Sequence, residues 1–199
     1  SLHPENQSQI LKHVTNKLID LHDGVATPFC ALPLILFISH MFNKSQPSTL
    51  GEFKQTVKEG VLPLMSLPYL SMYSGSIKQL LSNMVSSDSS LAPEFLRSIE
   101  LQWPLLDGTK QVYFLQIFIG IWEKMSLSSF KPMSSRVFTF LAEYVESSQA
   151  RVCQTILDIW DNVANDSWVA INSRSAIHAM YESVLNVVEK SWNKKSVEK

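Results

Sequence analysis

Almost the whole chain consists of amphipathic segments of similar length that are joined by short turns. In the first segment Pro4 and Gly24 stand at the two ends, and Ile10, Leu18 and Leu21 recur at helical spacing. We find no convincing two-residue alternation, and no Asn-Gly or Asp-Gly turn between β-branched runs. The sequence therefore predicts an all-α chain. The expected helices cover residues 4–22, 28–42, 49–64, 76–85, 93–103, 109–122, 132–146, 149–163 and 173–192.

The turns between these helices span about 3 to 10 residues, which favours antiparallel neighbours. A globular bundle and a stack of helical repeats both fit this pattern. The stack is favoured because the helices carry apolar residues on more than one side, as a layer between two neighbours must. We expect a HEAT-like α-α superhelix of about four helix pairs plus an N-terminal helix. Helices ending at Trp103 and Trp160 stand 57 residues apart, which is not a whole number of ~40-residue repeats.

One helical-repeat domain is expected over residues 1–199. The first residue is Ser1 and not Met, so the sequence is also consistent with a fragment of a longer superhelical protein. Thr27 before a proline predicts the start of the second helix. Thr49 with Glu52 forms a capping-box pattern, which predicts the start of the third.

Composition argues for a globular chain without a nucleic-acid or membrane partner. Hydrophobic residues make up 45% and charged residues 18%, and 17 basic against 18 acidic residues give a net charge of −1. Nucleic acid and anionic membranes favour clustered Lys and Arg, whereas the only basic cluster, Lys190 with Lys194 and Lys195, reads as a solvated tail. The longest apolar run, residues 29–42, is too short for a bilayer, which needs about 20 apolar residues.

The two cysteines suggest a reducing compartment. Cys30 and Cys153 lie in apolar helical runs 123 residues apart, and neither has a CxxC partner. We interpret both as buried packing thiols, which predicts a cytoplasmic or nuclear protein.

No motif for catalysis, cofactor binding or metal binding is found in the sequence. The GxxxxGK[ST] and GxGxxG loops are absent, the five histidines show no i,i+4 pairing, and no EF-hand spacing is present. The chain is therefore expected not to be an enzyme and to need no cofactor. Trp103, Trp122 and Trp160 are expected in the core, and Trp168 and Trp192 are better candidates for exposure.

A series of short segments, in order along nearly the whole chain, resembles the C-terminal half of one family. This is the B′ (B-fifty-six) family of regulatory subunits of protein phosphatase 2A. The matching segments are HDGVA at 22–26, VLPL at 61–64, LSMY at 70–73, LQWP at 101–104, KQVYFL at 110–115, the Ser147-Ser148 stretch with its following helix, and KSWNK at 190–194. Each segment is weak alone, and their common order identifies the chain as a divergent member.

The resemblance implies a HEAT-like superhelix that is not itself an enzyme. Such subunits bind the phosphatase scaffold and catalytic subunits and recruit substrates through a short Leu/Ile/Glu motif held in a groove. Here the positions matching the groove's basic residues fall at Leu50 and Phe53, and its apolar wall falls at Cys30, Ala31 and Ile35. An apolar pocket leaves a buried carboxylate unpaired, so we predict that this chain does not bind the motif in the family's usual way.

In the family, turns at the ends of later helices contact the catalytic subunit. The corresponding stretches here are residues 104–110 and 146–149, and their alternative role is simply to cap helices. The candidate partner-binding residues are Pro104, Asp107, Lys110, Glu146, Ser148 and Gln149.

The first hypothesis is thus a non-catalytic regulatory or scaffold module of a phosphatase complex. An unrelated helical-repeat adaptor is the alternative, because a fold does not determine a function. A helical enzyme with an unrecognised site is the least favoured.

Overall fold

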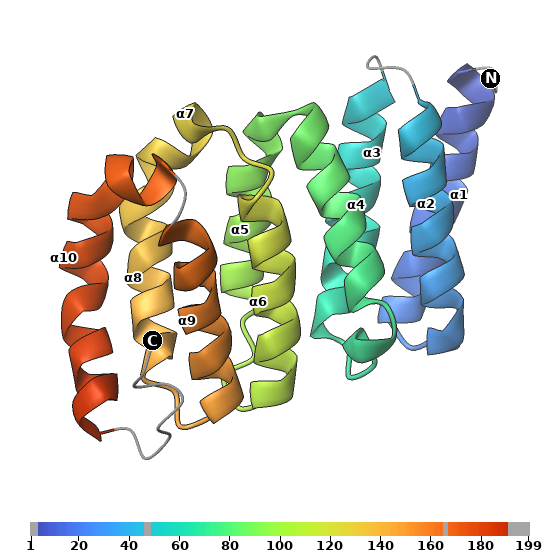
Figure 1. Ribbon diagram of the computed structural model, residues 1–199. Coiled ribbons are helices and arrows are strands. Elements are labelled where there is room, and N and C mark those ends of the chain that lie inside the picture. Colours follow the sequence, from blue (N-terminus) through green and yellow to red (C-terminus); the bar gives the residue numbers. More distant parts are fainter. Residues whose placement is uncertain (1–3, 46–48, 165–166, 191–199) are drawn as a thin grey trace. The chain divides into compact units, whose positions relative to one another are not determined.

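The computed structural model describes residues 4–45, 49–164 and 167–190, and every regular element in these ranges is a helix (Figure 1). The prediction of an all-α chain is confirmed. The α-helices are α1 Pro4–His22, α2 Ala31–Lys44, α3 Leu50–Thr56, α4 Ser74–Ser87, α5 Ala92–Leu101, α6 Gly108–Trp122, α7 Leu127–Phe130, α8 Ser134–Val145, α9 Ala150–Ala164 and α10 Ser167–Lys190. The chain forms two compact units, Ser1–Asp88 and Ser89–Lys199, which are described separately. A single domain over residues 1–199 stays a prediction.

In the first unit the helices pack in two layers. Helix α1 packs against α3 and the π-helical turn Val57–Val61, while α2 packs against α4. The layer of α1 is closely packed, because a Cβ atom on Gly60 would lie 2.9 Å from Leu18 Cδ1. The Thr15 and Thr56 hydroxyls form a buried hydrogen bond of 3.1 Å in the same layer. Only glycine lets the Leu18 side chain come this close to the backbone at residue 60.

The third predicted helix, residues 49–64, is a continuous helical segment with changing pitch. After α3 the chain forms the π turn and then a 3₁₀ helix, Leu62–Ser66, with Pro63 in its first turn. Pro63 has no backbone N–H to donate, which explains why regular α-helical bonding does not continue there. The phenol of Tyr73 donates a buried 3.0 Å hydrogen bond to the Leu64 carbonyl, which fixes the end of this segment.

The predicted starts of the second and third helices are correct, with Thr27 and Thr49 at the N-cap positions, but neither threonine makes a side-chain capping bond. Residues Pro28–Cys30 form a 3₁₀ turn before α2, and Thr27 is its N-cap residue. The Thr27 hydroxyl lies 3.6 Å from the Cys30 sulfur and makes no hydrogen bond to a backbone N–H of the turn. Thr49 likewise makes no side-chain capping bond. Its backbone at φ −95°, ψ 2° is not in the extended conformation that a capping box requires.

The second unit also consists of two layers. Helix α6 packs against α5 and α9, while α8 packs against α9 and α10. Aromatic side chains fill the space between them: Trp122 stacks on Phe130 at 5.2 Å, and both rings also contact Phe138. Trp103 and Trp122 are buried, as predicted.

Several sequence expectations differ from the structure. The last helix begins at Ser167, six residues before the predicted start, and the one-turn helix α7 was missed. Cys153 is buried as predicted, but the prediction for Cys30 is wrong: its thiol is exposed, because Cys30 ends the 3₁₀ turn Pro28–Cys30, which has no buried residue. The expectations for Trp160, Trp168, Trp192, Lys194 and Lys195 concern side chains outside the described part of the structure. No described helix is long and apolar enough to cross a membrane.

Candidate functional site

The turn between α5 and α6 is held by hydrogen bonds from its own residues. The Asp107 carboxylate accepts a 2.9 Å bond from the backbone N–H of Lys110 and caps α6. The buried amide of Gln111 donates to the backbone carbonyls of Pro104 at 2.9 Å and Leu105 at 3.4 Å. The buried Gln111 side chain therefore holds the backbone of the turn in one conformation. The capping of α6 by Asp107 does not by itself require these additional bonds.

Three leucines at this turn lie in solvent. The side chains of Leu101, Leu105 and Leu106 are 76%, 72% and 101% exposed. Exposed apolar residues that are grouped on a well-ordered turn are typical of a protein-binding surface.

The turn between α8 and α9 packs against the end of the α5–α6 turn. A Cβ atom on Gly108 would lie 2.6 Å from Gln149 Cγ, so the Gln149 side chain covers the first residue of α6. The Gln149 carbonyl accepts the backbone N–H groups of Val152 and Cys153 and starts α9. The structure thus brings Gln149 next to the segment with Asp107 and Lys110, although about 40 residues separate them in sequence. We call residues 104–110 and 146–149 the turn surface.

The remaining candidates of the second turn differ in surroundings. Ser148 is exposed. Glu146 is also exposed, but its carboxylate accepts a 3.1 Å bond from Asn186 of α10. Glu146 is therefore linked to α10 through its carboxylate.

Electrostatics single out Lys110 on the turn surface. Partial burial lowers the pKa of its ammonium group, and the carboxylate of Asp107 acts in the opposite direction. A partly desolvated cation next to exposed leucines can pair with an acidic group of a protein partner.

An aromatic cluster supports the turn from below. The ring of Trp103 lies 4.9 Å from that of Phe140, 4.7 Å from that of Tyr144 and 6.0 Å from that of Phe114, between ring centroids. Burial, together with the Glu143 carboxylate, raises the pKa of Tyr144. Ring contacts from two helices, α6 and α8, therefore fix the position of residue 103, immediately before the turn.

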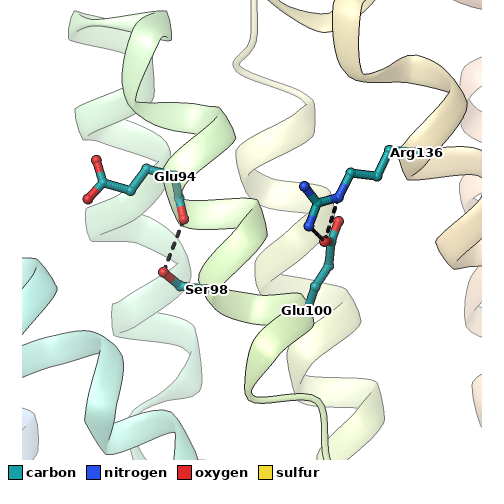
Figure 2. A network of polar contacts seen from close by, with 4 residues as sticks. All are labelled: Glu94, Ser98, Glu100 and Arg136. Carbon is teal, nitrogen blue, oxygen red and sulfur yellow. Dashed lines mark hydrogen bonds and ion pairs between the residues drawn. The ribbon is translucent and has the colours of Figure 1, made fainter.

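An ion pair joins α5 and α8 close to the aromatic cluster. Figure 2 shows Arg136 of α8 directed at the Glu100 carboxylate of α5, whereas the Glu94 side chain points away from this pair. The Nε atom of Arg136 lies 2.8 Å from Glu100 Oε2, and a second guanidinium nitrogen contacts the same oxygen. Ser98 donates to the Glu94 backbone carbonyl at 3.0 Å. The pair fixes α5 against α8 beneath the turn surface.

In the first unit, most positions matched to the family's peptide groove are core residues. Ala31, Ile35 and Phe53 are almost completely buried. Phe53 packs edge-on against Phe42, with ring centroids 5.4 Å apart. Cys30 is exposed, and Leu50 is half-buried. These side chains do not form one open wall, so the structure does not bring the five positions together as a binding groove.

A separate depression lies near the ends of α2 and α4. It has a volume of about 450 Å³, and its lining carries no charged side chain. Leu50 and Phe42 supply its apolar part, and the amides of Asn43 and Asn83 are joined across it by a 3.3 Å hydrogen bond. The other lining residues are Ser45, Ser86 and Ser87. This depression has no cation for an acidic anchor.

No group of three or more His, Cys, Asp or Glu side chains that could hold a metal ion occurs in the described residues. Sequence reasoning reached the two turns through the family resemblance, but it did not single out the three exposed leucines or Gln111. The sequence carried no signal for Gln111, because it follows Thr109 and Lys110 in the polar first turn of the helix.

Comparison with known proteins shows the family of the whole chain. The sequence model of the protein phosphatase 2A regulatory B subunit (B56 family) matches residues 1–199. The Caenorhabditis elegans phosphatase 2A regulatory subunit pptr-1 is 24% identical over 190 residues, covering 92% of this chain and 34% of that protein.

Two further relatives match a shorter part of the chain. The delta 2 isoform of the 56 kDa regulatory subunit from Schizosaccharomyces pombe is 25% identical over 142 residues, or 71% of this chain and 23% of its own length. The human beta isoform of the 56 kDa regulatory subunit is 24% identical over 142 residues, which cover 71% of this chain and 29% of that protein. The chain thus spans about a quarter to a third of the length of these curated relatives. Because the family model covers every residue, the chain belongs to the B56 family of protein phosphatase 2A regulatory B subunits.

Proposed function

We propose that this chain is a non-catalytic regulatory module that binds the scaffold and catalytic subunits of protein phosphatase 2A. The relatives are named as regulatory subunits of this phosphatase, which supports the assignment. The observation that carries the choice of surface is the packing of Gln149 against Gly108, which joins two turns next to Leu105 and Leu106.

The chemistry of the turn surface suits a protein partner. Exposed leucines can enter apolar pockets, and Lys110 and Glu146 provide charges at the edge. Such an arrangement, apolar in the middle and polar at the rim, is typical of protein interfaces. The buried Gln111 and the Trp103 cluster hold the turn before binding, so little ordering cost opposes association.

The test is binding of the purified chain to the purified complex of phosphatase scaffold and catalytic subunits, measured by biolayer interferometry. Leu106→Asp should weaken binding at least about tenfold, the loss expected for a central apolar anchor. Leu36→Asp is the matched control, because Leu36 is an exposed leucine on α2 and should leave affinity within about twofold. Wild-type chain that is folded but does not bind would reject the proposal and favour an unrelated helical-repeat adaptor. An equal loss of affinity in both variants would show that the interface does not lie specifically at the turn surface.

A second part of the proposal concerns substrate motifs. We propose that the chain does not hold a Leu/Ile/Glu peptide in the manner of its family, because Ala31, Ile35 and Phe53 are closed into the core. A fluorescent peptide with this motif and its Glu→Gln counterpart should both bind weakly and equally. Tight binding that is lost with the glutamate would contradict this.

We also propose a cytoplasmic or nuclear location, which rests on the thiols. Cys30 and Cys153 are both free, and burial raises the pKa of the Cys153 thiol, which keeps it protonated and unreactive. Secretion of the native protein with Cys30 in a mixed disulfide, detected by mass spectrometry, would contradict this location.

A further inference from the structure

Helix α10 presents an apolar stripe to solvent. Ile177, Tyr181, Leu185 and Val188 are 55%, 62%, 42% and 44% exposed. The side of α10 that carries Ala176, Met180 and Val187 is buried, and the helix packs against α8 and α9. The stripe is therefore an additional face and not the side by which α10 joins its own unit.

The spacing of the stripe fits another helix. Three residues of the stripe, Ile177, Tyr181 and Val188, together with the half-buried Val184, follow steps of four, three and four residues. The exposed Arg174 continues the series one step earlier. Alternating steps of three and four place side chains along one seam, which packs against a second helix by knobs-into-holes contacts. An extended peptide would need the two-residue period of a strand.

The stripe is also complementary to itself. Arg174 stands just before its first apolar residue, and Glu189 directly follows its last one, Val188. In an antiparallel pair of identical helices Ile177 lies opposite Val188, and Arg174 comes near Glu189 of the other copy at both ends. Each closed two-fold pair would thus make two ion pairs while covering the apolar stripe.

We propose that α10 binds a second copy of this chain in an antiparallel two-fold dimer. The dimer goes beyond the proposed phosphatase function and does not depend on it, because α10 residues 174–189 lie outside the turn surface. The contact is short: from Arg174 to Glu189 the helix rises about 22 Å, roughly two heptads. Such a small interface predicts association in the micromolar range.

Sedimentation velocity of the full chain, at concentrations from about 1 to about 200 μM, tests the dimer. The wild-type chain should shift from monomer to dimer over this range. Tyr181→Glu should remain monomeric, because it places a charge in the middle of the seam. Tyr69→Glu is the matched control, an exposed tyrosine in the first unit, and should dimerise like wild type. Circular dichroism of both variants checks that they are folded.

A charge exchange tests the antiparallel arrangement. Arg174→Glu should weaken the dimer at least about fivefold, since each end then holds two like charges. Adding Glu189→Arg to the same chain should restore affinity to within about twofold of wild type. A monomer at every concentration, a dimer that survives Tyr181→Glu, or failure of the second exchange to restore affinity would each overturn the proposal.

Discussion

The two units place their family-matched positions in opposite environments. In the first unit Ala31, Ile35 and Phe53 are closed into the core, whereas in the second unit Leu105 and Leu106 stand in solvent next to Lys110. Three of the five positions matched to the groove thus take part in core packing, while Leu105 and Leu106 in the matched turn are accessible. A resemblance in sequence order therefore locates equivalent segments, and only burial decides which of them can still contact a partner.

The difference has a physical origin. The side chains that line a groove between helices also lie beside the contacts that pack those helices together. An apolar side chain at such a position therefore readily becomes part of the core. A turn stays at the protein surface because its backbone polar groups need hydrogen bonds from water or from specific partners. The Gln111 side chain supplies such a bond to the Pro104 carbonyl.

The largest effect should come from Phe53→Ala. This side chain is fully buried against Phe42, so its truncation should lower the free energy of unfolding by about 3–5 kcal/mol. Leu106→Ala should change it by less than about 0.5 kcal/mol, because the side chain is already in solvent. Urea denaturation measures both. A comparable loss for the two variants would remove the contrast between the units.

Alkaline pH should destabilise the first unit through Tyr73. Burial raises the pKa of Tyr73 to about 12, above the value of about 10 expected in the unfolded chain. The folded state then holds the proton more tightly, so the stabilisation is complete below pH 10 and falls by at most about 1.4 kcal/mol per pH unit between pH 10 and 12. Tyr73→Phe should be less stable at pH 8, because it loses the bond to Leu64, and should show a shallower decline. If the stability of Tyr73→Phe fell as steeply with pH as that of the wild type, the loss of stability would come from groups other than Tyr73.

The two closely approached glycines offer a direct comparison of the units. Gly60→Ala should cost about 1–3 kcal/mol, because its Cβ meets the buried Leu18 side chain at 2.9 and 3.1 Å. Gly108→Ala meets only the flexible, exposed Gln149 side chain and should cost less than about 1 kcal/mol while disturbing phosphatase binding. Gly51→Ala, with nothing within 4 Å, is the control in thermal melts. If Gly60→Ala proved neutral, the close packing of α1 would be disproved.

The smallest effect is expected at the ion pair in Figure 2. Arg136 is 57% exposed, so solvent screening limits its contribution even though Glu100 is only 13% exposed. Arg136→Met should lower stability by about 0.5–1 kcal/mol, and 1 M NaCl should reduce the difference from wild type. A loss above about 3 kcal/mol would mean that Glu100 behaves as a buried charge.

Periodicity was sufficient to predict the helices, because apolar residues at helical spacing mark the faces that pack, as in α1 and α5. It could not predict the π turn Val57–Val61 or the one-turn α7, since such elements are too short to show a period. Nor could it show that Leu105 and Leu106 are exposed, because a turn carries no period and only tertiary packing decides whether its side chains are covered. The turn positions came from the family resemblance, whereas Gln149 against Gly108 required the structure.

Hydrogen exchange of the chain, with and without the phosphatase scaffold–catalytic complex, tests the contrast between the units most directly. We expect added protection of backbone amides at residues 105–111 and 146–150, and unchanged exchange around residues 30–36 and 50–54. Protection of the latter segments, with no change at the two turns, would contradict the assignment of the turn surface as the phosphatase-binding site.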